Sequence, residues 1–395
     1  MKSRVIHILA GWFFALTFML GPPAGAEDSG ALFPAPFWNP DGTYAGYGFV
    51  NSSGRQLIPG RFASARPFSE GLARVMDNDH KYGYIDKNGR LVIPCKYKFA
   101  GDFHEGVAVA TIEDKSGYIN KSGRELFPFD NVNPWTFSDG LGCVSHYLPG
   151  EIWWVDKYGR TMISRAFGAC APFHEGLALL FVGSGTGILS NPTGRGYQMS
   201  SAESGSIGAM DKSGNVVFTI KKQVGAYRPF SEGLALVQAM TDAGMRFGFI
   251  DKTGEFTVQP QYLDAHPFSE GLAAVSVGNP QGGAVNWGYI DKTGAMKIPD
   301  KFHTAESFHE GLASVVAAES SAYSFIDKTG KILFTLEDAV PAVDYEDKFD
   351  YKTGDRRSGF FFKDGLCKVR LKSGKIEYLD KNGKKTWESE KPDYY

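Results

Sequence analysis

The chain has 395 residues, of which 43% are hydrophobic and 14% aromatic, and its formal net charge is −2. This is enough apolar material to bury a continuous core, whereas the near-neutral charge gives no overall field that would attract nucleic acid or an anionic membrane. The 48 Gly and 20 Pro residues supply many turns, a composition that suits an all-β structure.

The N-terminus has the pattern of a cleavable secretory signal. Two basic residues precede an apolar run from Val5 to Leu20, and small residues place the cleavage site after Ala26. This run is shorter than the roughly 20 residues of a membrane-spanning helix, so an uncleaved anchor is the weaker reading. We expect residues 1–26 to be removed and the protein to be periplasmic or secreted, with no stable membrane insertion afterwards.

Residues 27–45 are rich in Pro and aromatic side chains, among them Phe33 and Trp38. This composition indicates an extended lead-in or cap that covers the start of the main array. The array is assigned to residues 46–388, and residues 389–395 form a C-terminal tail.

Two short motifs recur along the array. The first is Phe-x-Glu/Asp-Gly followed by Leu or Val, with its glycine at Gly71, Gly106, Gly140, Gly176, Gly233, Gly271, Gly311 and Gly365. The second has Asp or Asn three positions before Gly, at Asn51, Asp86, Asn120, Asp156, Asp211, Asp251, Asp291, Asp327 and Asp380. This regularity predicts a repeat architecture in which each unit buries its apolar face against its neighbours.

Each unit is predicted to hold three antiparallel strands. In one copy these are residues 72–76, 82–86 and 90–94, which are rich in β-branched and apolar side chains. Asp86 is expected to accept hydrogen bonds from its own turn, and Gly89 to take a left-handed conformation.

The Phe of the first motif is predicted to plug the joint between units. The acid that follows it is expected to accept backbone N–H bonds at a tight entry to the next strand. The recurrent residues are Phe68, Phe103, Phe137, Phe173, Phe230, Phe268, Phe308 and Phe362.

Two intervals of the first motif are lengthened by insertions, residues 183–206 and 337–358. Insertions in repeat proteins tend to gather on one face and often carry binding, although tolerated surface loops are the commoner case. The candidate binding residues are Arg195, Tyr197, Asp344, Tyr345, Asp347, Tyr351, Arg356 and Arg357.

Residues 287–294, Trp-Gly-Tyr-Ile-Asp-Lys-Thr-Gly, with the preceding Phe-Ser-Glu-Gly-Leu-Ala at 268–273, resemble the WG-repeat family of bacterial β-repeat proteins. The similarity runs from about Gly46 to Lys385. The Trp of the family motif is kept at Trp287 and replaced in sister units by Tyr82, Ser116 and Phe247. The resemblance implies an array of short antiparallel strands and a role in binding or scaffolding. It implies no known catalytic centre, so no catalytic residue can be carried over.

No residue set for catalysis or metal binding is recognisable in the sequence. His104, His174 and His309 precede Glu in the first motif, but the second His of a zinc-protease helix is lacking and the following Gly opposes a helix. We therefore expect no enzyme activity, no metal and no cofactor. The cysteines lack C-x-x-C spacing, and their disulfide pairing stays open; they are Cys95, Cys143, Cys170 and Cys367.

The predicted fold is all-β, with tandem three-stranded antiparallel β-repeats of about 35 residues. An open superhelical array is favoured, because the first unit lacks its opening strand while the last has all three, so the chain ends do not complement each other. The alternative is a closed, β-propeller-like array, although propeller blades usually need roughly 40–45 residues.

The function expected from these features is that of an exported, non-catalytic repeat protein that binds or scaffolds a protein or a cell-envelope polymer. Nucleic acid is not an expected partner. The alternative is an envelope glycan hydrolase that uses carboxylates of the second insertion, such as Asp344 and Asp347, and a purely structural spacer is a third hypothesis.

Overall fold

The computed structural model describes residues 30–146, 152–165, 171–182, 197–198, 206–220, 224–278, 286–318, 320–340, 349–350, 355–356 and 360–393. All regular secondary structure in these residues is β-strand. The expected signal sequence, residues 1–26, and most of both insertions lie outside the described residues.

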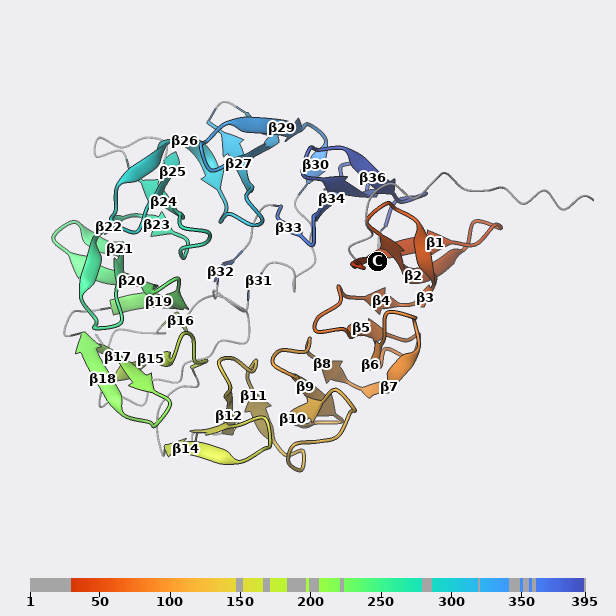
Figure 1. Ribbon diagram of the computed structural model, residues 1–395, viewed down its shortest axis with the longest axis horizontal. Helices are drawn as coiled ribbons and strands as arrows, with labels where there is room; N and C mark the ends of the chain where they lie inside the picture. Colours follow the sequence, from red (N-terminus) through yellow and green to blue (C-terminus); the bar gives the residue numbers. More distant parts are fainter. Residues whose placement is uncertain are drawn as a thin grey trace, which may run out of the picture.

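The strands form small antiparallel sheets, called blades below, that follow one another around a ring (Figure 1). The first two blades contain β1 (Leu32–Trp38), β2 (Tyr44–Asn51) and β3 (Gln56–Phe62), then β4 (Ser64–Ala65), β5 (Ala73–Met76), β6 (Tyr82–Ile85) and β7 (Leu91–Tyr97). The next two contain β8 (Phe99–Ala100), β9 (Val107–Ile112) and β10 (Lys115–Asn120), then β11 (Val132–Pro134), β12 (Gly142–His146), β13 (Ile152–Val155) and β14 (Thr161–Arg165).

The fifth and sixth blades contain β15 (Leu177–Val182), β17 (Ser206–Asp211) and β18 (Val216–Ile220), then β16 (Tyr197–Gln198), β19 (Val224–Ser231), β20 (Leu234–Thr241), β21 (Gly244–Ile250) and β22 (Phe256–Tyr262). The seventh and eighth share a sheet of β23 (Asp264–Ala265), β24 (Ala273–Val277), β25 (Asn286–Ile290), β26 (Met296–Ala305), β27 (Ala313–Ala317), β28 (Tyr323–Ile326) and β29 (Ile332–Leu336). The ninth contains β30 (Ala339–Val340), β33 (Phe362–Lys363), β34 (Leu366–Leu371), β35 (Ile376–Asp380) and β36 (Lys385–Glu388), and a separate hairpin pairs β31 (Phe349–Asp350) with β32 (Asp355–Arg356).

Within a blade the chain meanders outwards from the middle of the ring. In the sixth blade, β19 lies towards the centre and β22 at the rim (Figure 1). The second blade shows the register, in which Ala73 pairs with Ile85 and Tyr84 with Ile93. The three predicted strands of a unit are confirmed, and a short inner strand such as β4 adds a fourth to several blades.

The turn predicted between the last two strands of a unit is confirmed. Asp86 Oδ1 accepts from the N–H groups of Asn88 and Arg90, each at 2.9 Å, and Gly89 has φ +80°. Gly89 N–H donates to the Asp86 carbonyl at 2.9 Å, and the same bond recurs in all nine copies of the motif. An acceptor side chain before a left-handed Gly therefore ends one strand and starts the next.

The hydrophobic core lies at the joints between blades, as predicted. One cluster joins Tyr84 and Ile93 of the second blade to Phe103 and Ala110 of the third. At seven of its eight positions the recurrent Phe packs against an aromatic side chain of the preceding blade, as Tyr84 and Phe103 show with ring centroids 4.7 Å apart. The exception is Phe230, which shares a cluster with Ala209 of the fifth blade. Phe308 is likewise fully buried.

The ring is closed, so of the two predicted arrangements the structure shows the propeller-like alternative and not the favoured open array. The expectation of openness missed the role of the lead-in: β1 pairs along β2 and supplies the strand that the first unit lacks. Phe33 and Ala35 of β1 then share a core cluster with Leu366 and Tyr378 of the last blade. We call this contact the closing joint.

The C-terminal tail seals the closing joint. The Tyr47 hydroxyl donates to Asp393 Oδ2 at 2.5 Å, and Arg370 of the last blade lies 3.6 Å from the same carboxylate oxygen. Lys391 Nζ donates to the Gly42 carbonyl at 2.9 Å. Asp393 is fully buried between the two ends of the chain.

Candidate functional site

The first motif forms a two-residue hairpin turn, called the Glu-Gly turn below. In the second blade, Ser69 and Leu72 exchange both backbone hydrogen bonds, at 2.9 and 3.1 Å. Glu70 and Gly71 between them have φ values of 51° and 88°. This geometry suits a hairpin that follows the twist of its strands, but it normally takes Asn or Asp before Gly. A Glu there is held in an unfavourable conformation, so a compensating contact is expected.

That contact is made with the next blade. The Glu70 carboxylate accepts from the N–H groups of Glu105 and Gly106, at 2.6 and 2.8 Å, and these two residues form the Glu-Gly turn of the third blade. Glu105 in turn accepts from Asp139 and Gly140. The remaining links run from Asp139 to Gly176, Glu175 to Gly233, Glu232 to Gly271, Glu270 to Gly311 and Glu310 to Gly365. The prediction that this acid accepts backbone N–H bonds is confirmed.

A lysine of the next blade completes most of these links. This lysine directly follows the Asp or Asn of the second motif. Its contact with the acid therefore places the second-motif turns and the Glu-Gly turns on one face of the ring, called the turn face below. Lys121 Nζ lies 3.1 Å from the Glu70 carboxylate and also donates to the Glu70 carbonyl at 2.9 Å. The other pairs are Lys212–Asp139, Lys252–Glu175, Lys292–Glu232, Lys328–Glu270 and Lys381–Glu310.

These donors set the protonation of the acids. Partial burial alone would raise the pKa of Glu70, but the Gly106 N–H and Lys121 outweigh it and hold the pKa below its ordinary value. The pKa of Asp139 is lowered in the same way, against burial, by the Gly176 N–H and Lys212. Glu70 and Asp139 are therefore ionised clamps between blades, which favours a structural role over proton transfer for these two acids.

The insertions are placed at the centre of the ring as far as they are described. The hairpin β31–β32 lies in the middle of the ring, and β16 adds an inner strand to the sixth blade by pairing with β19 (Figure 1). Tyr197 falls in β16 and Arg356 in β32. The other candidates lie outside the described residues: Arg195, Asp344, Tyr345, Asp347, Tyr351 and Arg357. Their binding role stays a prediction.

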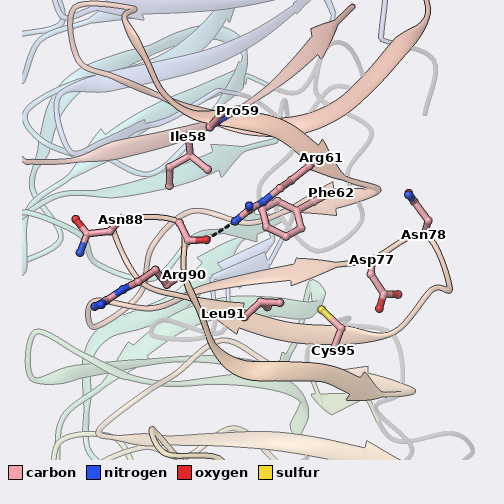
Figure 2. A pocket seen from close by; sticks show the side chains of 11 residues that line it. Ile58, Pro59, Arg61, Phe62, Asp77, Asn78, Asn88, Arg90, Leu91 and Cys95 are labelled. Carbon is pink, nitrogen blue, oxygen red and sulfur yellow. Dashed lines mark hydrogen bonds between the residues drawn. The ribbon is translucent and has the colours of Figure 1, made fainter.

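A groove of about 710 Å³ between the first and second blades was not predicted (Figure 2). Arg61, Asp77 and Cys95 are among its lining residues. Arg61 donates to the Gly89 carbonyl, and burial raises the pKa of the Cys95 thiol to about 11, which makes it a poor nucleophile near neutral pH. Asp77 starts the turn between β5 and β6, and Gly89 of the second motif also lines the groove.

The cysteines differ in state. Cys143 is disulfide-bonded, Cys95 and Cys367 are free, and Cys170 lies outside the described residues. Among the residues that the structure describes, no three His, Cys, Asp or Glu side chains gather into a metal-binding group. The described part of the chain also holds no helix with the length and apolarity to cross a membrane.

Comparison with solved structures shows similarity of fold alone. A eukaryotic initiation factor is 12% identical with a TM-score of 0.56, over 89% of this chain and 94% of that chain. A computationally designed protein is 14% identical over 81% and 96% of the two chains, with a TM-score of 0.45. BamB from Moraxella catarrhalis is 10% identical over 83% and 87%, with a TM-score of 0.39.

No curated protein matches the chain in sequence. The family model "WG containing repeat" matches residues 47–79, 82–115, 207–239, 247–279 and 287–316. Each match covers the outer strands of one blade and the inner strands of the next, so the sequence repeat spans a joint. With five such matches along the ring, the chain is a WG-repeat protein.

Proposed function

We propose that this protein is an exported, non-catalytic binding or scaffold protein for a protein or a cell-envelope polymer. The observation that carries the proposal is the position of the two insertions, whose described strands β16 and β31–β32 lie at the inner side and centre of the ring (Figure 1). The repeated acids and aromatics are used at the joints, which leaves the non-repeated segments for recognition. Irregular segments on a rigid scaffold are where proteins commonly bind.

Deletion variants test this role. Residues 183–206 and 337–358 are each replaced by a short Gly-Ser linker, and a variant shortened within residues 279–285, another link between blade strands, serves as the control. Binding is measured by cosedimentation with purified peptidoglycan and by quantitative pull-down from envelope extract. Loss of binding in the insertion variants alone supports the proposal, and undiminished binding after loss of both insertions refutes their role.

Export is tested separately. Cell fractionation and N-terminal sequencing of the mature protein are expected to give a periplasmic or secreted chain that starts at Glu27. A cytoplasmic chain that retains residues 1–26 would contradict this part of the proposal.

A further inference from the structure

The first blade carries a reduced copy of the Glu-Gly turn. Phe33 pairs with Val50 just before the Asn51 turn, as Ala73 pairs with Ile85 just before the Asp86 turn. Gly30 therefore occupies the position of the turn acid, and its φ of 64° is close to the 51° of Glu70. Lys87 Nζ donates to the Gly30 carbonyl at 2.6 Å, as Lys121 does to the Glu70 carbonyl. The backbone of the link is kept, but the carboxylate is missing because the residue is Gly.

The donors for this carboxylate remain in the second blade. They are the N–H groups of Glu70 and Gly71 and the ammonium of Lys87, the same three that meet Glu70 in the third blade. No described residue accepts from the N–H of Glu70 or Gly71. A side chain at position 30 would point towards this site, since a Cβ built on Gly30 would lie 3.6 Å from Lys87 Nζ.

We propose that Glu70 N–H, Gly71 N–H and Lys87 form a carboxylate-binding site that takes an acidic side chain of a polypeptide. The argument is internal to this chain, because seven sister links hold an Asp or Glu carboxylate on the equivalent Gly N–H, and in two of them the N–H of the preceding acid donates as well. One lysine and two N–H groups match the charge and the two oxygens of one carboxylate. The carboxylate comes from a second molecule or from Glu27 or Asp28, which precede Gly30 in the sequence.

This site goes beyond the proposed function and is independent of the insertions. It lies on the turn face, whereas the first insertion leaves β15 at the end away from the Glu-Gly turn. Deleting the insertions therefore leaves the site intact, and failure of one proposal does not imply failure of the other.

Amide NMR shifts of the full chain test the site. The probe is acetyl-Gly-Glu-Gly-amide, whose only carboxylate is the side chain, and acetyl-Gly-Gln-Gly-amide is the neutral control. The Glu peptide is expected to shift the Gly71 amide saturably, while the Gly106 amide, already bonded to Glu70, stays in place. Lys87→Gln is expected to weaken binding about tenfold, the usual scale for losing one charge-assisted bond.

Substitutions at Gly30 provide the matched pair. Gly30→Glu supplies the carboxylate within the chain, so the Gly71 amide is expected to shift without peptide and to lose its response to it. Gly30→Gln is expected to keep the response. Equal shifts with the Glu and Gln peptides would overturn the proposal.

A double variant, Glu27→Gln with Asp28→Asn, separates the two sources. The chain's own acid fills the site if the Gly71 amide of this variant differs in shift from that of the wild type without peptide, and if it responds to the Glu peptide while the wild-type amide does not. If the wild type responds directly, the acid comes from a second molecule. A Gly71 amide that responds in neither protein rules the site out.

Discussion

The aromatic ring of Phe33 lies 5.3 Å from that of Tyr378, and the Tyr378 hydroxyl donates to the Pro34 carbonyl at 2.8 Å across 344 positions of sequence. The internal joint between the seventh and eighth blades has a similar pair of contacts, with the ring centroids of Tyr289 and Phe308 4.9 Å apart and the Tyr289 hydroxyl 2.8 Å from the Glu306 carbonyl. The closing joint therefore has the same kinds of contact as an internal joint, a Tyr packed on a Phe and bonded to a carbonyl of the next blade, although Phe33 and Pro34 occupy other positions in the blade than Phe308 and Glu306.

Tyr378→Phe is expected to lower the free energy of unfolding by about 1 kcal/mol, because it removes a buried hydrogen bond and keeps the ring. Urea denaturation measures the loss. Tyr289→Phe, at the internal joint, is the matched variant and should lose a similar amount. A Tyr378→Phe protein as stable as the wild type, beside a destabilised Tyr289→Phe, would show that the ring is not closed in solution.

Asp393→Asn is expected to cost about 3–5 kcal/mol, because it leaves Arg370 and Tyr47 without their buried anionic partner. Thermal unfolding followed by circular dichroism measures this effect. Glu390→Gln, an exposed acid in the same tail, is the control and should change little. Equal stability of both variants would argue against the tail as a seal.

Phe308→Ala is expected to cost about 3–5 kcal/mol, since it empties a fully buried plug between two blades. The control is Phe99→Ala, because Phe99 is 43% exposed on a short inner strand. Urea midpoints of the two variants give the comparison. A loss at Phe99 that matches the loss at Phe308 would contradict a core built at the joints.

Glu270→Gln is expected to lower the free energy of unfolding by about 1 kcal/mol, because the neutral amide loses Lys328 and weakens the bond from the Gly311 N–H. The control is Glu255→Gln, an exposed acid whose carboxylate pairs with no described residue. The loss should shrink at high salt, as expected for a partly exposed ion pair.

Stability is expected to fall at acid pH. The pKa values of Glu70, Asp139 and the turn residue Asp86 lie below the ordinary 4.5 of Glu and 3.8 of Asp. Acids with lowered folded pKa stabilise fully above those values, and the contribution is lost as pH falls through the lower, folded pKa. The melting temperature should thus drop progressively below about pH 4.5, and Glu70→Gln should flatten the drop. A melting temperature that is constant from pH 7 to pH 3 would contradict this assignment.

The repeated structural features could be predicted from the sequence, whereas the features of a unit that has lost the repeat motifs could not. The Asp86–Gly89 turn and the Phe103 plug were predictable because each rests on local chemistry that recurs many times. The closure of the ring was not predictable, since β1 has the sequence Leu-Phe-Pro-Ala-Pro-Phe-Trp and shares no motif with β5, although both strands occupy the same place in a blade. The receiver of the Glu70 carboxylate was also hidden, because it lies 35 positions further along the chain.

The presence of Gly30 at the position of the turn acid also affects where the ring is expected to unfold locally. Gly30 leaves the first blade without a carboxylate to offer the second. Ser52 stands where all eight other copies of the second motif have a lysine, so the first blade also lacks the lysine that would pair with Asp364. Among the described blades, only the first lacks this electrostatic latch on both sides. The Asp393 contacts hold the first blade to the last but do not reach the second, so local opening should begin at the joint between the first and second blades, whose amides should exchange with solvent deuterium ahead of those at the internal joints.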